Sequence, residues 1–189
     1  MQKQSEIIKQ LTDKELVKQL VISQMLLLLL AIILSLFFFG DFSDWAHYFR
    51  LDGPGIIYYG VLPGLIIVIL DILFVIIFPE KYYDDGGIND KIFRKRPLIQ
   101  IAGIALITAI SEELLFRGVL QTTFGYVVAS IFFAVVHIRY LKKPLLLISV
   151  LFVSFYIGYI FLLTENLYTT ITAHFVVDFL LGAVIRFKK

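Results

Sequence analysis

Two adjacent glutamates and an arginine lie inside an apolar stretch of the chain, at residues 98–120. Glu112, Glu113 and Arg117 occur within the segment Ser-Glu-Glu-Leu-Leu-Phe-Arg, and the surrounding stretch is long enough to cross a lipid bilayer. A charged side chain at the centre of a membrane-spanning helix costs about 2.5–3.5 kcal/mol even on the lenient insertion scale. Three such groups need partners or a reaction to keep them there, so this cluster is the first candidate for a functional site.

The spacing of these three residues divides them into a pair and a single acid. Glu113 and Arg117 are four residues apart and share a helix face, whereas Glu112 is turned by about 100° from Glu113. We therefore expect Arg117 to neutralise and orient Glu113, and Glu112 to face a water-containing cavity. A free carboxylate in a low-dielectric pocket holds a proton more readily than in water, which suits a general base. The alternative is that both glutamates bind Arg117 and only hold the helices together.

Two histidines in later apolar stretches could act with these carboxylates. Phe133 and His137 are four residues apart, and so are His174 and Asp178. A carboxylate four residues from a histidine shares its helix face and can fix the tautomer of the imidazole. A lone histidine in a membrane more commonly makes a hydrogen bond between helices. The pair of His174 and Asp178 is therefore the more specific signal.

The composition shows what kind of protein must position these residues. Of the 189 residues 59% are hydrophobic and only 17% are charged, compared with about a quarter in a typical soluble domain. The composition is that of an integral membrane protein with one domain. The net charge of +2 and the lack of a basic stripe argue against a nucleic-acid partner. Without cysteine, thiol catalysis, disulfides and cysteine-ligated metals are excluded.

Six apolar stretches are long enough for membrane-spanning helices, which need about 20 residues each. The predicted fold is an all-α polytopic membrane helical bundle with spans at residues 21–39, 56–78, 98–120, 122–141, 144–163 and 167–185. In this arrangement 15 of the 17 Lys and Arg residues lie on one side of the membrane. By the positive-inside rule, both termini are expected to be cytoplasmic.

The chain is expected to have three parts. These are an amphipathic cytoplasmic segment at residues 1–20 with a capping box from Thr12 to Glu15, a two-helix membrane anchor with a polar loop at 21–97, and a four-helix core at 98–189. With a helical rise of 1.5 Å per residue, Glu112 lies about 21 Å from the cytoplasmic start of its span, and His174 about 10 Å from the outer end of its own. These two residues can therefore meet, whereas His137 is expected nearer the cytoplasmic end.

The order and spacing of these motifs resemble the signature of a known family. Glu112-Glu113-x-x-x-Arg117, then Phe133-x-x-x-His137, then His174-x-x-x-Asp178 is similar to the pattern of the CAAX protease and bacteriocin-processing (CPBP, or Abi) family. That family includes prenyl-protein endopeptidases of the Rce1 type and lysostaphin-resistance-A-like bacterial proteins. The resemblance covers roughly residues 98–185, and the string Glu-Glu-Leu-Leu-Phe-Arg-Gly is its most specific element.

The resemblance implies a role for each motif residue. Glu112 would activate the attacking water with help from His137, and Glu113 and Arg117 would form the supporting pair. His174 and residue 178 would bind or polarise the scissile carbonyl group. The prenyl-protein branch usually has Asn at the last position. An ionised Asp178 only accepts hydrogen bonds, so we expect it to orient His174, with His174 as the donor.

We favour an intramembrane endopeptidase that hydrolyses a peptide bond of a membrane-associated protein or peptide, by CAAX-type or leader- or bacteriocin-peptide processing. Glu112 would act without a metal, or Glu112, His137 and His174 would hold a divalent metal such as zinc. A proton-coupled transporter is an alternative, because buried acids and histidines also form proton relays. A non-catalytic scaffold or bacteriocin-immunity protein is another. The expected location is a bacterial plasma membrane, with lipid and substrate as partners and no oligomeric state assigned.

Overall fold

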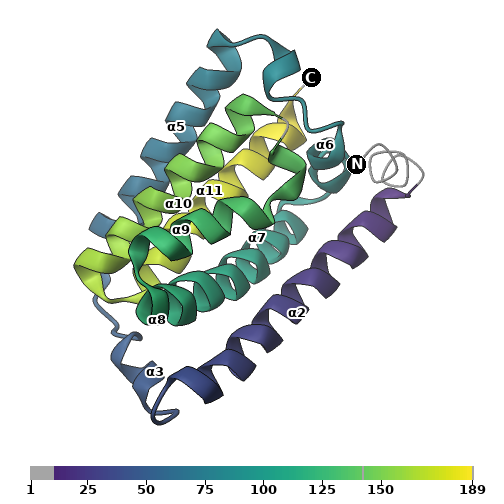
Figure 1. Ribbon diagram of the computed structural model, residues 1–189. Helices are drawn as coiled ribbons and strands as arrows, with labels where there is room; N and C mark the ends of the chain where they lie inside the picture. The colour runs from purple at the N-terminus through teal and green to yellow at the C-terminus, as the bar shows by residue number, and fades with distance from the viewer. Residues whose placement is uncertain (1–10, 142, 189) are drawn as a thin grey trace.

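The computed structural model describes residues 11–141 and 143–188, and in this part of the chain all regular structure is helical (Figure 1). The long α-helices are α2 (Asp13–Phe38), α5 (Leu62–Ile77), α7 (Leu98–Glu113), α10 (Pro144–Thr164) and α11 (Leu167–Phe187). Shorter α-helices are α3 (Asp44–His47), α4 (Gly53–Ile56), α6 (Ile88–Phe93), α8 (Thr122–Phe124) and α9 (Tyr126–Val136). Two π-helical segments, η1 (Ile57–Val61) and η3 (Leu114–Gln121), and two 3₁₀ turns, η2 (Glu80–Tyr82) and η4 (Ile138–Tyr140), complete the order.

Five continuous helical segments of the described chain are long and apolar enough to cross a membrane. They are Asp13–Phe38, Gly53–Ile77, Leu98–Phe124, Pro144–Thr164 and Leu167–Phe187. This confirms the predicted all-α membrane bundle. Large apolar side chains remain exposed along these helices, for example Leu36, Phe37 and Ile76, as expected where lipid rather than water surrounds the protein.

The fourth expected span differs from the prediction. Instead of one helix over residues 122–141, the structure has α9, which covers Tyr126–Val136 only. Gly125 ends the preceding helix with φ +88°, a conformation that side-chain-bearing residues rarely adopt. At 1.5 Å per residue the 11 residues of α9 extend about 16 Å, roughly half of the hydrocarbon thickness. The apolar composition of the segment therefore reflects burial in the bundle as well as contact with lipid.

The first long helix also begins earlier than the expected span. The predicted capping box is confirmed, because Thr12 Oγ1 accepts from the Glu15 amide and the Glu15 carboxylate accepts from the Thr12 amide at 2.8 Å. Residues 13–20 are thus the first turns of α2, continuous with the apolar segment. Residues 1–10 of the expected amphipathic segment lie outside the described residues. Helix α2 packs along α7 and η3, and α5 packs along α11.

Small residues set the close approach of the helices in the bundle. A Cβ atom at Gly64 of α5 would lie 2.8 Å from Val176 Cβ and 2.9 Å from the Ala173 carbonyl oxygen of α11. At Gly118 of η3, a Cβ atom would lie 2.6 Å from the ring of Trp45 in α3. The absence of a side chain at Gly64 lets α5 pack against α11. The absence of one at Gly118 lets Trp45 of α3 pack against η3.

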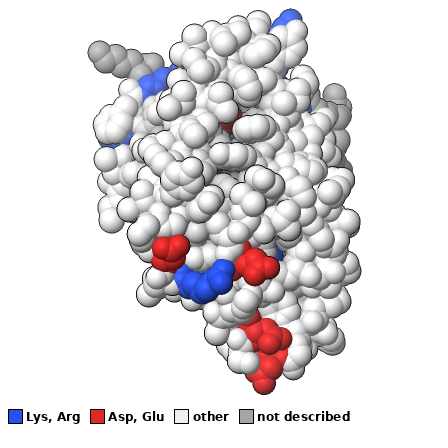
Figure 2. All heavy atoms as spheres, turned by 90° about the vertical axis from the view of Figure 1, so that its left-hand side faces the viewer, with Lys and Arg blue, Asp and Glu red and all other residues white. Residues whose placement is uncertain are grey.

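Charged side chains gather at the two ends of the bundle. Acidic residues and one arginine lie exposed near the loops after α2 and α10, namely Asp41, Asp44, Asp52, Glu165 and Arg50. At the other end, Arg96 donates to the Asp13 carbonyl at 2.9 Å and Arg186 donates to the Arg96 carbonyl at 2.9 Å, which joins the start of α2 to the end of α11. Figure 2 shows a largely uncharged surface between one end, where acidic side chains flank one basic side chain, and the other end, where basic side chains appear. We call these the acidic and the basic end.

Candidate active site

Glu112 is held at the last turn of α7 by a side chain from α2. Gln24 Nε2 donates to Glu112 Oε1 at 3.0 Å, and Gln24 Oε1 accepts from Ser111 Oγ at 2.6 Å. An amide oxygen can only accept and an amide nitrogen only donate, so these two bonds fix the orientation of the Gln24 amide. Glu112 and Gln24 are both buried, at 6% and 7% exposure. Helix α2 therefore binds one carboxylate oxygen of Glu112, Oε1, and leaves Oε2 available for a different contact.

Glu113 binds two partners deep in the bundle. Its Oε2 lies 3.4 Å from Arg117 Nε, and its Oε1 lies 2.9 Å from His174 Nδ1. The expected i,i+4 pair of Glu113 and Arg117 is thus present, and both side chains are fully buried. The carboxylate accepts, so Nδ1 of His174 carries the proton in this contact. Glu113 therefore links the motif on α7 to the motif on α11.

Besides Glu113, Arg117 contacts a serine and an aromatic ring, while its Nη1 is buried without a hydrogen-bond partner among the described residues. Its Nη2 donates to the Ser154 carbonyl at 3.1 Å and lies 3.3 Å from Ser154 Oγ. The guanidinium lies 5.0 Å from the centroid of the Phe133 ring, within the range of a cation–π interaction. Phe133 also contacts His137 and His174, with ring centroids 4.9 Å and 6.0 Å away. The phenylalanine of the second motif therefore packs against every basic group of the site.

His174 presents its second nitrogen to two further carboxylates. Nε2 lies 3.6 Å from Asp178 Oδ2 and 3.9 Å from Glu112 Oε2. We expected Asp178 to orient His174, but the shorter contact of this histidine is the one from Nδ1 to Glu113. Glu112 Oε2 is buried and has no hydrogen-bond partner among the described side chains. The atoms available for chemistry are thus Glu112 Oε2 and His174 Nε2, which face each other.

His137 reaches the same cavity because α9 is short. It follows the last residue of α9, and its Nδ1 lies 2.7 Å from the Phe133 carbonyl oxygen. A carbonyl oxygen only accepts, so Nδ1 carries the proton and Nε2 keeps its lone pair. The ring stacks on Tyr140 with centroids 5.6 Å apart. Our sequence-based layout put His137 closer to the cytoplasmic end than Glu112, because it assumed a full-length fourth span.

A cavity of about 600 Å³ joins these residues. Its lining includes Glu112, His137, His174 and Asp178, and continues along α2 from Gln24 to Leu16. The eight helical steps between these two residues correspond to a depth of about 12 Å. Apolar residues of α6 and α11 line the wall, including Ile92 and Ile185. Because Leu16 and Ile185 lie near the ends of their helices, the cavity extends from the carboxylates to the basic end.

The donor set expected for a metal is not gathered into one ligand sphere. Within residues 11–141 and 143–188, no three His, Cys, Asp or Glu side chains are placed so that they could hold one metal ion. Glu112, His137 and His174 line one cavity, but they do not form such a group. Zinc requires its ligands at about 2.0–2.2 Å in tetrahedral geometry. The donor set therefore does not fit zinc in this arrangement.

Gln24 is the site residue that the motif analysis missed. It has no charged partner at helical spacing in its own helix, and the spacing of residues within one helix cannot show a contact with residue 112. The available signal was its position, since it is a polar amide inside the apolar run 21–39. A polar side chain within a spanning helix commonly marks a hydrogen bond to another helix.

Buried carboxylates, an arginine and histidines around one cavity in an apolar helical bundle define a polytopic membrane protein with the groups for hydrolytic chemistry. Residues 94–180 match the family described as type II CAAX prenyl endopeptidase Rce1-like. The chain is also 43% identical over 166 residues to the uncharacterized protein YpbD of Bacillus subtilis (strain 168). The aligned region covers 88% of each of the two proteins. No solved structure matches the chain. The protein belongs to the Rce1-like family, in agreement with the motif resemblance.

Proposed function

We propose that this protein is an intramembrane endopeptidase in which Glu112 activates a water molecule. The observation that carries the proposal is the contact of 3.9 Å between Glu112 Oε2 and His174 Nε2 beside the cavity. Glu112 Oε1 is occupied by Gln24, so Oε2 is the oxygen that can accept a proton from water. Family membership supports peptide-bond hydrolysis as the reaction.

In the proposed reaction, Glu112 and His137 act on the attacking water, and His174 acts on the carbonyl oxygen of the scissile bond. Glu112 Oε2 removes a proton from water, and the oxygen of that water attacks the carbonyl carbon. His137 Nε2, which has a lone pair, accepts a hydrogen bond from the same water. His174 Nε2 donates to the carbonyl oxygen as it becomes negative, with its Nδ1 proton held by Glu113. The C–N bond then breaks, and the amine leaves with the proton that Glu112 had taken.

Asp178 and Arg117 act in this proposal through His174 and Glu113. The carboxylates of Glu112, Glu113 and Asp178 lie within 4 Å of the His174 ring and can balance a positive charge on it. Asp178 itself accepts hydrogen bonds only, so it cannot bind the developing oxyanion. In the proposal, Asp178 interacts with the N–H of His174 Nε2 before the substrate carbonyl binds there. Arg117 holds the Glu113 side chain in place.

We further propose that the substrate is a membrane-associated peptide or protein that enters from the basic end. The cavity wall between that end and Glu112 combines aliphatic and uncharged polar side chains, which suits the side chains and peptide groups of an extended apolar segment. A CAAX-type C-terminus and a leader or bacteriocin peptide both have this character. By the positive-inside rule the basic end faces the cytoplasm of a bacterial cell, so the substrate would be a cytoplasmic segment.

The experiment compares the wild type with Glu112→Ala on a quenched-fluorescence library of membrane-associated peptides. Loss of cleavage in the variant, with an unchanged melting temperature, supports Glu112 as the base. Equal cleavage by both proteins would contradict the assignment. Because the donor set does not fit a metal, EDTA and 1,10-phenanthroline are expected to leave the rate unchanged; inhibition that added zinc reverses would refute the metal-free reaction.

A further inference from the structure

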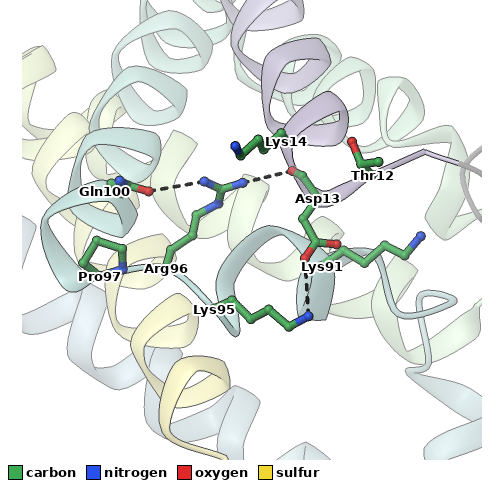
Figure 3. A pocket seen from close by; sticks show the side chains of 8 residues that line it. All are labelled: Thr12, Asp13, Lys14, Lys91, Lys95, Arg96, Pro97 and Gln100. Atoms are coloured by element: carbon green, nitrogen blue, oxygen red, sulfur yellow. Dashed lines mark hydrogen bonds and ion pairs between the residues drawn. The ribbon is translucent and has the colours of Figure 1, made fainter.

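A second cavity, of about 620 Å³, lies at the basic end outside the candidate active site. Its walls come from the first turn of α2, from α6 and the residues that follow it, and from the first turn of α7 (Figure 3). Four of its lining side chains are cationic and one is acidic: Lys14, Lys91, Lys95, Arg96 and Asp13. The cavity therefore carries a local excess of positive charge.

Arg96 is fixed at the centre of this cluster by neutral acceptors. Its Nε donates to the Ile92 carbonyl at 2.7 Å, its Nη1 to Gln100 Oε1 at 3.2 Å, and its Nη2 to the Asp13 carbonyl at 2.9 Å. Figure 3 shows the guanidinium lying between Gln100 and Asp13. None of the three acceptors carries a charge, so the hydrogen bonds hold the guanidinium in place without neutralising it.

The acids described nearby offset only part of the charge of Lys14 and Lys95. Lys95 Nζ lies 4.0 Å from Asp13 Oδ2, and the Lys95 side chain is 84% exposed, so the pair contributes little. Glu15 accepts from Thr12 in the capping box, and Asp90 pairs with Arg94 at 2.9 Å. These two acids are therefore committed to contacts of their own.

The start of α7 adds a further site for negative charge. Pro97 precedes the helix, and no side chain caps its first turn. A helix N-terminus carries about half a positive charge and exposes amide donors to an anion. Pro97 and Gln100 of this turn line the cavity together with the cationic side chains. The ligand that this combination suits is a compact oxyanion.

We propose that this cavity binds a phosphate group, supplied by the headgroup of an anionic phospholipid or by free phosphate. The cavity lies where α2 and α7 begin, at the level where membrane-spanning helices meet lipid headgroups. Basic pockets between helices at this level bind anionic headgroups by the same chemistry. The site is separate from the active-site cavity, to which α6 contributes Ile88 and Ile92.

Binding here would hold α6 against α2 and α7. Lys91 and Lys95 face the phosphate cavity, whereas Ile88 and Ile92 line the active-site cavity. Lys91 already donates to the Leu11 carbonyl at 3.1 Å, which ties α6 to the start of α2. A phosphate group between the lysines and Arg96 would strengthen the same junction, so the ligand is expected to raise the melting temperature of the protein.

The test is titration of the detergent-solubilised full chain with short-chain phosphatidylglycerol, short-chain phosphatidylcholine and inorganic phosphate, followed by calorimetry. The variant is Lys14→Gln with Lys95→Gln, two exposed side chains whose loss leaves the hydrogen bonds of Arg96 intact. The control is Lys81→Gln with Lys188→Gln, which removes the same charge elsewhere at the basic end. Each lysine near a bound anionic lipid is expected to contribute about fivefold in affinity, so the first variant loses about 25-fold.

The outcomes separate the sources of the phosphate. Binding of phosphatidylglycerol, with little binding of phosphatidylcholine or inorganic phosphate, supports a lipid headgroup. Binding of inorganic phosphate that competes with the lipid supports free phosphate. No saturable binding of either anion to the wild type would overturn the proposal. Equal loss in the Lys14 and Lys95 variant and in the control would also overturn it, because that result indicates diffuse attraction to a basic surface.

Discussion

Replacing Gln24 by leucine tests whether the first long helix takes part in the proposed chemistry. The side chain of Gln24 bonds Glu112 at 3.0 Å and Ser111 at 2.6 Å, so leucine removes both contacts at nearly constant volume. A hydrogen bond to a charged group contributes about 1.5–3 kcal/mol. If that contribution orients Glu112 for the chemical step, kcat falls by about 10- to 150-fold and KM changes little.

The assay is cleavage of a single peptide selected from the quenched-fluorescence library, with kcat and KM measured separately. Gln19→Leu is the matched control, because Gln19 lies on the same helix and lines the same cavity but does not contact Glu112. Ser111→Ala is expected to lower kcat by about fivefold, since it removes one neutral hydrogen bond of about 1 kcal/mol from the Gln24 amide. Thermal unfolding of each variant monitors the fold.

Two results would refute this reasoning. If Gln24→Leu and Gln19→Leu have the same kcat as the wild type, Glu112 needs no orientation from α2. If Gln24→Leu lowers the melting temperature while kcat is unchanged, Gln24 only joins two helices. A fall in kcat confined to Gln24→Leu and Ser111→Ala would support a positioning role.

The other predictions concern stability and can be measured by thermal unfolding in detergent. Arg117→Met leaves the carboxylate of Glu113 buried without its cation, so the free energy of unfolding should fall by about 3–5 kcal/mol; adding Glu113→Gln should restore part of it, and an unchanged melting temperature would contradict the pairing. Gly64→Ala places a methyl group 2.8 Å from Val176 and should cost about 1–3 kcal/mol. Gly103→Ala, with no neighbour within 4 Å of its Cβ, should stabilise the protein by about 0.5–1 kcal/mol; equal effects of the two alanines would contradict the packing argument.

Contacts within one helix could be predicted from the sequence because they depend on spacing alone. The pairing of Glu113 with Arg117 follows from a separation of four residues, and the structure confirms it at 3.4 Å. The proximity of His174 and Asp178 follows from the same rule, and it too is confirmed at 3.6 Å. In each case the helix itself fixes the distance, so no knowledge of the bundle is needed.

Contacts between helices could not be predicted, because spacing says nothing about which helices meet. The bond from Gln24 to Glu112 and the contact of Glu113 with His174 both join separate segments. The shortness of α9 was missed for another reason. Residues 122–141 are apolar enough for a full span, and hydropathy does not register the positive φ of Gly125 that separates α9 from α8. Because α9 starts after Gly125 and has only 11 residues, His137 at its end lies partway across the bundle.

The buried layer beyond the candidate active site has a consequence for the membrane as an electrical barrier. On the side of Glu112 that faces the acidic end, Leu115, Phe116 and Val119 are at most 3% exposed, and the cation of Arg117 is fully buried in the same segment. Water that fills the cavity from the basic end therefore meets a buried, partly apolar layer before it reaches the other side. An ion entering with that water would have to shed its hydration shell to go further. In the proposed reaction, the protein would thus bring water to a peptide bond inside the bilayer without opening a path for ions across it.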